Sequence, residues 1–345
     1  MRQENNINLS IIIPVYNEEN YIKKLFGDIL LYFNFENIEI IFVNDGSFDQ
    51  SKKIIEDLKK STNYSFSFKI INLDENNGKG KAVRIGMKKS LGEYILLQDA
   101  DLELDLKDAR EIYDIIIKDK SIMCIFGSRY LSGKLKKHNY FINQLIGKFN
   151  TLLFNIFFGQ SLTDIHCGLK IMHRDVYEKI KLSVNDFGLE LDLASQVIKN
   201  NFFIYEVGVS YYSRTKKAGK KITWIDGIKS YFYLFKFRFI DNSPSTKLSL
   251  LISSIYMCYT GSFFGMGIGN TLFIIIFTLA GLIIGLNTKI ISTLFIFLFI
   301  YLGSLIGSGQ GKVLSVLIFF VAAILIVKKI KKTYKFNKGL ISNLF

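Results

Sequence analysis

The stretch YILLQDADLELD, residues 94–105, decides the fold of the first part of this 345-residue chain. Its apolar run stops at Gln98, and the carboxylates of Asp99, Asp101 and Glu103 follow at once. A strand that is apolar throughout is covered on both faces, as in a parallel sheet. Hard cations prefer oxygen ligands, and Mg²⁺ is often shared between carboxylates and phosphates. The stretch predicts a buried strand that ends at a cation site, with a solvated acidic turn as the alternative.

Strand-like and helix-like segments alternate on both sides of this stretch. Short β-rich runs lie at residues 7–15, 38–44, 67–73 and 121–127, and amphipathic periods lie at 21–33, 51–60, 81–90 and 106–118. This alternation predicts an α/β fold with a mostly parallel sheet flanked by helices. Such sheets bind ligands at the carboxyl ends of their strands.

The expected strand ends carry polar or glycine-rich sequence, namely IPVYNEE at 13–19, VNDGS at 43–47 and NNGKGKAVR at 76–84. These groups should meet the carboxylates of residues 99–103 at one edge of the sheet. Asp45 could accept hydrogen bonds from a nucleoside, although the Asp-Gly pair at 45–46 is also a common turn signal. Lys79 lies in a loop whose glycines allow close approach of a ligand, but the spacing is not that of a Walker loop.

Composition changes near residue 244. Residues 248–288 contain no charged residue or histidine, and about 20 apolar residues of helix cross a bilayer. We expect four membrane spans, with two as the alternative, at residues 248–268, 271–286, 290–306 and 313–327. An even number keeps the basic residues of 328–338 on the cytoplasmic side, as the positive-inside preference requires. Glycine pairs in two of these spans suit close helix packing, within one subunit or in a homo-oligomer.

The net charge of +14 is concentrated around the expected spans. This placement favours anionic lipid headgroups and argues against a nucleic-acid partner. Residues 222–240 interleave aromatic and basic side chains, which predicts a helix in the headgroup region, with a core helix as the alternative. The three cysteines lack metal-ligand spacing, so a reducing compartment is expected.

We therefore expect a cytoplasmic domain at 1–221, an interfacial helix and linker at 222–247, transmembrane helices at 248–327 and a basic cytoplasmic tail at 328–345. The N-terminal residues are polar and lack the apolar core of a secretory signal. We expect an integral protein of a bacterial or archaeal inner membrane, with the domain at 1–221 facing the cytoplasm.

The ordered motifs resemble the family 2 glycosyltransferases, in the branch of dolichyl-phosphate mannose and glucose synthases and their bacterial polyprenyl-phosphate relatives. The resemblance lies between residues 11 and 239, in IIIPVYNEEN, VNDGSFDQS, NNGKGKAVRIGM, GEYILLQDADLE, GSRY, TDIHCGLKIMHR, FGLELDLA and YYSRTKKAGKKITWIDGI. It implies a nucleotide-sugar-binding domain of the GT-A type, followed here by the transmembrane helices. It also implies an inverting hexosyltransferase that moves a hexose from GDP-mannose or UDP-glucose to a polyprenyl phosphate. The product would be a lipid-linked sugar for envelope glycan or glycoprotein synthesis.

The resemblance also assigns residues to roles. The residues expected at the nucleotide sugar are Pro14, Tyr16, Glu18, Asp45, Lys79, Asp99 and Asp164. Asp99 and Asp101 match the D-x-D motif that holds Mg²⁺ or Mn²⁺, and Glu103 lies where a third ligand is often supplied. Arg214, Lys220 and Lys221 lie in a basic loop expected at the acceptor phosphate. The expected catalytic residues are Asp101, Arg129, Arg214 and Glu190.

Several alternatives stay open from the residues themselves. Guanidinium groups bind phosphates, but Arg129 and Arg214 could each form a surface ion pair. A hydroxyl acceptor, in diacylglycerol or a saccharide, would need Glu190 or Asp192 as a general base, whereas a lipid phosphate is already ionised. A non-catalytic membrane scaffold that keeps the fold is a third hypothesis. His138 and His173 are expected in solvated loops, and His166 with Cys167 does not complete a zinc site.

Overall fold

A computed structural model of the chain describes residues 7–33, 37–61, 66–131, 133–137, 140–215, 219, 221 and 224–241. The chain divides into two units, 1–235 and 236–345. In the second unit the structure describes residues 236–241, with a π-helical turn at Lys236–Ile240. The expected spans and basic tail lie outside the described residues. Within the described ranges, no helix combines the length and the apolar character needed to cross a bilayer.

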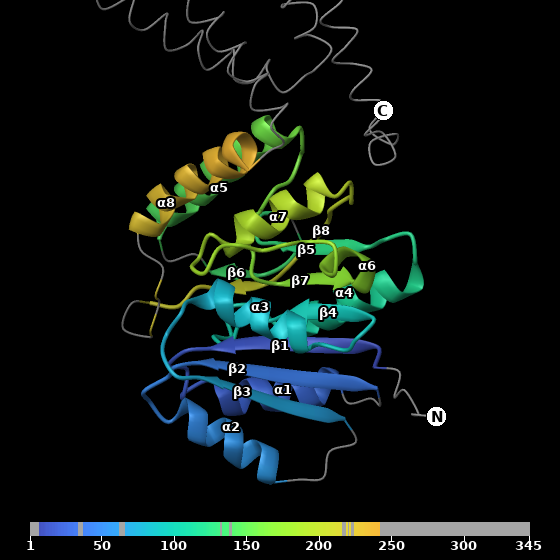
Figure 1. Ribbon diagram of the computed structural model, residues 1–345, viewed down its shortest axis with the longest axis vertical. Coiled ribbons are helices and arrows are strands. Elements are labelled where there is room, and N and C mark those ends of the chain that lie inside the picture. Colours follow the sequence, from blue (N-terminus) through green and yellow to red (C-terminus); the bar gives the residue numbers. More distant parts are fainter. Residues whose placement is uncertain are drawn as a thin grey trace, which may run out of the picture. The chain divides into compact units, whose positions relative to one another are not determined.

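A seven-stranded sheet forms the centre of the first unit (Figure 1). In spatial order its strands are β3 (Ser67–Leu73), β2 (Ile38–Asp45), β1 (Leu9–Val15), β4 (Tyr94–Leu97), β7 (Lys170–His173), β5 (Cys124–Ser128) and β8 (Tyr205–Gly208). Strand β7 is antiparallel to both neighbours, and every other adjacent pair is parallel. The prediction of a mostly parallel sheet is confirmed.

The first helices follow the strands in alternation. They are α1 (Ile22–Tyr32), α2 (Ser51–Lys60), α3 (Lys79–Lys89) and α4 (Leu106–Lys118). Leu9, Ile11 and Ile13 of β1 pack in one core cluster with apolar residues of α1 and α4. Ile12 points the other way, because a Cβ added to Gly86 of α3 would lie 2.4 Å from its Cγ2. The sheet is thus covered on both faces, as its apolar strands require.

The later elements build over the second half of the sheet. They are β6 (Lys136–Lys137), α5 (Phe141–Phe158), α6 (Arg174–Tyr177), α7 (Leu189–Lys199), β9 (Tyr211–Tyr212) and α8 (Trp224–Phe235). Strands β6 and β9 form a second, parallel pair. Helices α5 and α8 lie side by side (Figure 1), with the rings of Phe149 and Tyr231 5.9 Å apart.

One expectation about histidine was wrong. His173 is the last residue of β7, and its partly buried ring packs edge-on against Tyr94 at 5.1 Å. It also caps α6, because its side chain accepts a hydrogen bond from the backbone N–H of Asp175. The antiparallel β7 places it there, and no strand was predicted over these residues. His138 lies outside the described residues.

Candidate active site

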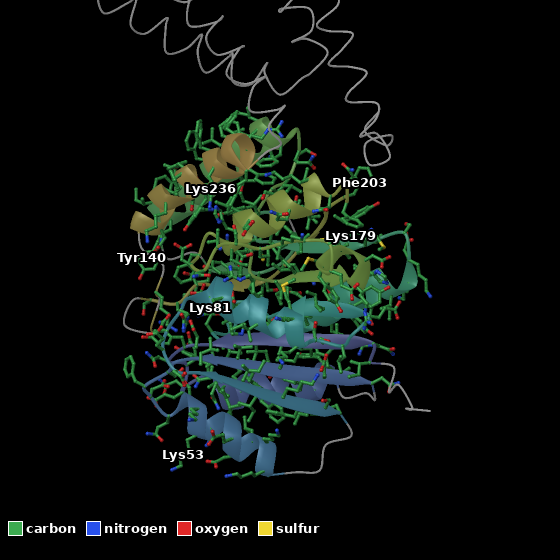
Figure 2. The ribbon with its side chains drawn as sticks, viewed as in Figure 1. Lys53, Lys81, Tyr140, Lys179, Phe203 and Lys236 are labelled. Carbon is green, nitrogen blue, oxygen red and sulfur yellow. The ribbon has the colours of Figure 1, made fainter. Side chains whose placement is uncertain are left out.

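A cavity of about 410 Å³ opens at the carboxyl ends of β1, β2 and β4. The predicted site residues that line it are Pro14, Tyr16, Glu18, Asp45, Lys79, Asp99, Asp101, Glu103, Arg129, Glu190, Arg214 and Lys221. Lys220 lies outside the described residues. Figure 2 shows Lys81, near the start of α3, and Tyr140, just before α5, on the same side of the molecule. Most of the expected residues therefore lie at the carboxyl ends of the parallel strands, where such sheets bind ligands.

Asp45 joins the end of β2 to the start of α3. Its Oδ1 accepts a hydrogen bond from the backbone N–H of Asn77 at 2.9 Å, and its Oδ2 accepts one from Gly78 at 2.8 Å. Gly78 precedes α3 with a φ of 94°, a conformation that glycine adopts without strain. Asp45 thus fixes the glycine loop beside the cavity, whichever group of a ligand it also meets.

Lysines and carboxylates alternate in a chain of ion pairs that begins at the cavity wall. Lys79 Nζ lies 2.7 Å from Asp99 Oδ1 and 3.0 Å from Glu190 Oε1, and Glu190 also pairs with Lys170. Lys170 is fully buried in β7. Burial alone would raise the pKa of Glu190, but Lys170 and Lys79 together lower that pKa to about 2. Glu190 is therefore a firmly ionised group.

Arg214 contacts the carboxylates of Glu18, Asp101 and Glu103. Its Nη1 lies 2.8 Å from Glu18 Oε2 and its Nη2 lies 2.9 Å from Asp101 Oδ2, while its backbone N–H donates to Glu103 at 2.7 Å. Lys221 Nζ lies 2.6 Å from Glu18 Oε1. Burial and the neighbouring Asp99 raise the pKa of Asp101 to about 7, against the opposing effect of Arg214. The segment after β9 is therefore tied to the end of β1 and to the acidic turn after β4.

These carboxylates fit a divalent cation that is shared with a phosphate ligand. Among the residues that the structure describes, no three His, Cys, Asp or Glu side chains are arranged as a metal site. Asp99 and Asp101 nevertheless repel each other at the cavity wall, as the raised pKa of Asp101 indicates. Mg²⁺ usually takes one or two carboxylates, with phosphates and waters as its other ligands. The ligand roles of Asp99, Asp101 and Glu103 stay a prediction that suits this donor set.

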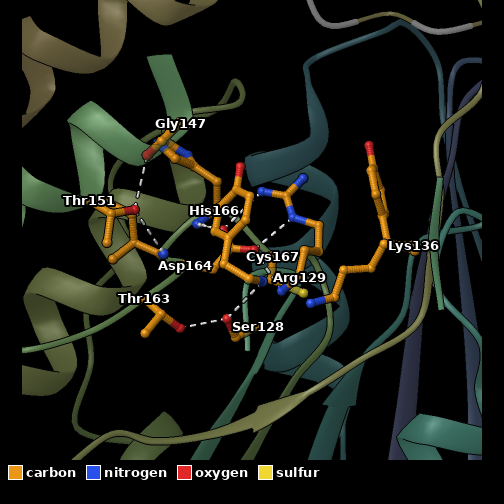
Figure 3. A network of polar contacts seen from close by, with 12 residues as sticks. Ser128, Arg129, Lys136, Gly147, Thr151, Thr163, Asp164, His166 and Cys167 are labelled. Atoms are coloured by element: carbon orange, nitrogen blue, oxygen red, sulfur yellow. Dashed lines mark hydrogen bonds and ion pairs between the residues drawn. The ribbon is translucent and has the colours of Figure 1, made fainter. Parts of the chain in front are cut away.

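Asp164 is buried and pairs with the guanidinium group of Arg129 (Figure 3). It is not among the residues that line the cavity. Its Oδ2 accepts from Arg129 Nε at 2.7 Å, and its Oδ1 accepts from Nη2 at 2.9 Å. The guanidinium group holds the pKa of this buried carboxyl below its usual range, although burial alone would raise it. Nearby, the hydroxyls of Ser128 and Thr163 are 2.6 Å apart. Arg129 thus reaches the cavity with two of its nitrogens already engaged.

The sequence did not indicate that α5 and α8 form part of the cavity wall. Asn143, Gln144 and Asn150 line it from α5, and Asp226 and Ser230 line it from α8. The polar residues of α5 recur at spacings of three and four within FINQLIGKFNTLLFNIFF, so they share one helical face. That polar stripe was the available signal.

Comparison with known proteins agrees with this fold. Residues 10–181 match the model of the family described as Glycosyl transferase family 2. The chain therefore carries a family 2 glycosyltransferase domain.

Several curated relatives are each named dolichyl-phosphate beta-glucosyltransferase. The relative from Dictyostelium discoideum is 27% identical over 231 residues, which is 63% of this chain and 69% of the relative. Those from Saccharomyces cerevisiae and Homo sapiens are 29% and 28% identical, over 66% and 62% of this chain and 73% and 69% of their own. The prediction of a hexosyltransferase is confirmed by these relatives.

Solved structures show the same fold at low identity. Glucosyl-3-phosphoglycerate synthase from Mycobacterium tuberculosis, in complex with Mn²⁺, UDP-glucose and phosphoglyceric acid, has a TM-score of 0.52 at 13% identity. That match covers 69% of this chain and 81% of the other. The same enzyme with Mg²⁺ and UDP has a TM-score of 0.53 at 12% identity, with the same coverage. The likeness shows a GT-A-like α/β fold, as the sequence predicts.

Proposed function

We propose that the chain transfers a hexose, with inversion, from a nucleotide sugar to a polyprenyl phosphate at a membrane surface. The names of the curated relatives support glucose as the sugar and a dolichyl-type phosphate as the acceptor. UDP-glucose is then the preferred donor, and GDP-mannose is the alternative. In the reaction an acceptor phosphate oxygen bonds to the anomeric carbon, and the bond from that carbon to the donor diphosphate breaks. The nucleoside diphosphate leaves with the electron pair.

The observation that carries the proposal is the state of Glu190. Two lysines hold its pKa at about 2, so it is too weak a base to activate a hydroxyl near neutral pH. Asp192 is fully buried and accepts hydrogen bonds from the backbone of Ser183 and Val184, away from the cavity wall. An acceptor that is already an anion needs neither residue. These facts favour a phosphate acceptor over a diacylglycerol or saccharide hydroxyl.

The charged end of the cavity suits a donor diphosphate. Lys79, Arg214 and Lys221 supply positive charge there, and such charge stabilises the negative charge that grows on the leaving group. A divalent ion held by Asp99 and Asp101 would add Lewis-acid stabilisation of the same oxygens. The pKa of Asp101 is raised to about 7, and a bound cation would keep this carboxyl ionised as a ligand.

The outer face of α5 supports an acceptor that arrives from a lipid surface. Its large apolar side chains are between 47% and 73% exposed and recur on one helical face, at Phe141, Ile142, Leu145, Phe149, Leu152 and Ile156. Phe232 of the neighbouring α8 is also exposed. Contiguous exposed apolar surface of this kind marks a protein or membrane interface. The opposite face of α5 lines the cavity, so one helix would join the lipid surface to the site.

The test incubates the detergent-solubilised chain with radiolabelled UDP-glucose or GDP-mannose and one of four acceptors, with or without EDTA. The acceptors are undecaprenyl phosphate, dolichyl phosphate, diacylglycerol and a free saccharide. We expect a labelled polyprenyl-phosphate product that is lost with EDTA and restored by Mg²⁺ or Mn²⁺. A label found on diacylglycerol or the saccharide would contradict the phosphate acceptor, and no labelled product from any donor would support the scaffold hypothesis.

A further inference from the structure

Asn150 and His166 form a polar pair at the cavity wall that the mechanism above does not use. Asn150 belongs to α5, and its Nδ2 lies 3.2 Å from Nε2 of His166, in the loop that leads to β7. Both residues line the cavity. Asn150 is 1% exposed, and among the described residues its Oδ1 has no hydrogen-bond partner.

The Asn150 amide oxygen is a buried acceptor with no partner among the described residues. A buried polar atom without a partner costs about 1–3 kcal/mol, so folded proteins rarely keep one without a reason. A carboxamide has a donor end and an acceptor end, and only one of them faces the His166 ring. Whichever end that is, the other end has no partner among the described residues, and Asn150 lines the cavity.

The surrounding groups favour a neutral, hydroxyl-rich ligand. Burial lowers the pKa of His166 to about 4, so the ring is uncharged near neutral pH. Asn143, Gln144 and Tyr130 lie in the same wall and carry no charge at that pH. The amide, imidazole and aromatic groups can donate to and accept from hydroxyls, as sites for sugars require. Arg129, the cation beside this wall, already donates its Nε and Nη2 to Asp164.

This neutral wall begins next to the charged end of the cavity. Gly168 lies two residues after His166, and a Cβ added to it would lie 2.2 Å from Asp99 Oδ2. The loop that carries His166 therefore passes directly against the carboxylate expected beside the diphosphate. The sugar of a nucleotide sugar is attached to that diphosphate, so the neutral wall lies where the sugar would bind.

We propose that Asn150 and His166 form a subsite that binds a hydroxyl of the transferred hexose. Asn150 makes the hydrogen bond, and His166 is a positioning residue that holds the amide in one orientation. The inference rests on the proposed function, because its ligand is the hexose of the donor. A site built to bind a hydroxyl rejects the analogue that lacks it, because its own buried groups are then left unpaired. Asn150 would thus help to choose the sugar.

The experiment measures binding, so it does not depend on turnover. Isothermal titration of the full-length, detergent-solubilised protein with Mg²⁺ compares UDP-glucose, its monodeoxy analogues and UDP, and then GDP-mannose, its monodeoxy analogues and GDP. For the wild type we expect one monodeoxy analogue to bind about tenfold more weakly than its parent, as the loss of one buried hydrogen bond would give. In Asn150→Leu that preference should vanish, while the affinity for UDP or GDP changes less than twofold. His166→Gln should keep part of the preference, and His166→Phe should lose it.

Asn155→Leu is the matched control on the same helix. The Asn155 amide bonds both the backbone N–H and the carbonyl of Leu162, at 3.0 Å and 2.7 Å, and it does not line this cavity. Its loss should lower the melting temperature and leave the hydroxyl preference intact. The subsite is overturned if Asn150→Leu keeps the wild-type preference, if it weakens sugar nucleotide and free nucleotide equally, or if the wild type has no preference.

The two proposals fail separately. In one outcome the wild type prefers the hydroxyl through Asn150 but glycosylates no polyprenyl phosphate. That result would support the subsite and contradict the proposed acceptor. A wild type that makes the lipid-linked sugar while Asn150→Leu discriminates normally would overturn the subsite alone.

Discussion

Asp101 is poorly placed for the stability of the folded chain. Burial and the neighbouring Asp99 raise its pKa to about 7. The folded pKa then lies above the ordinary value, so stability is lost as pH rises between the two. At pH 8 in EDTA, we expect Asp101→Asn to raise the free energy of unfolding by about 1–2 kcal/mol. Hexose transfer should fall at least about 100-fold, because charge stabilisation at the leaving group is lost. Urea unfolding and the radiolabel assay check this, and a variant less stable than wild type would contradict it.

His166 has a lowered pKa, and the sign of its effect is the reverse. Burial lowers its pKa to about 4, with Asp164 opposing and Arg129 adding to that effect. Its neutral form is favoured in the fold, so this part of the stability is present above pH 6.5 and is lost as pH falls through 4. Between pH 7 and pH 4.5, the wild type should lose about 2 kcal/mol more than His166→Gln. Urea unfolding at the two pH values measures the difference, and equal losses would show that the ring titrates normally.

Two helical glycines, Gly27 and Gly80, show how contacts override helix propensity. A Cβ on Gly27, exposed on α1, would meet nothing within 4 Å. A Cβ on Gly80 of α3 would lie 2.3 Å from the carbonyl oxygen of Val184. Gly27→Ala should therefore raise the free energy of unfolding by about 0.5–1 kcal/mol. Gly80→Ala should lower it by about 1–3 kcal/mol. Urea unfolding of the two variants measures these changes. An increase in the free energy of unfolding in both variants would contradict the close packing at the start of α3.

The elements that the sequence predicts well are those whose apolar faces point inward. Helices α2 and α4 begin and end at the predicted residues, because their apolar period faces the sheet. Helix α5 was not predicted, because its apolar stripe faces outward and its polar stripe faces the cavity. Strand β7 was missed because it is short and contains Lys170, a buried charge that pairs with Glu190 and donates to the Cys167 carbonyl.

The site was predictable to the extent that it depends on strand ends. Pro14, Glu18, Asp45 and Asp101 lie at or just after the carboxyl ends of parallel strands, and one rule brings them to one edge. The remaining partnerships join residues far apart in the chain, as when Arg214 meets Glu18 across almost the whole first unit. Such pairing depends on where loops return after the sheet is built, and local sequence patterns do not encode it.

The chain as a whole should behave as an integral membrane protein, although its first unit has a core of its own. Residues 248–288 carry no charged residue or histidine, so leaving a bilayer would expose a long apolar surface to water. The full-length chain should therefore stay in the membrane pellet after an alkaline carbonate wash, and a chain ending at residue 241 should be released. Release of the full-length chain would contradict the predicted spans.

The released fragment should still bind anionic vesicles, because the exposed stripe of α5 belongs to the first unit. Leu145 and Leu152 are 53% and 52% exposed on that stripe. Placing glutamate at both should leave the circular dichroism unchanged and weaken sedimentation with vesicles at least about tenfold, since buried apolar area is replaced by charges facing anionic headgroups. The control pair places glutamate at Leu31 and Leu91, which are 69% and 56% exposed outside α5. Because that pair adds the same charge, general repulsion from the vesicles would weaken both variants equally. Loss confined to the α5 pair would identify this helix as the lipid-facing surface through which the acceptor reaches the cavity.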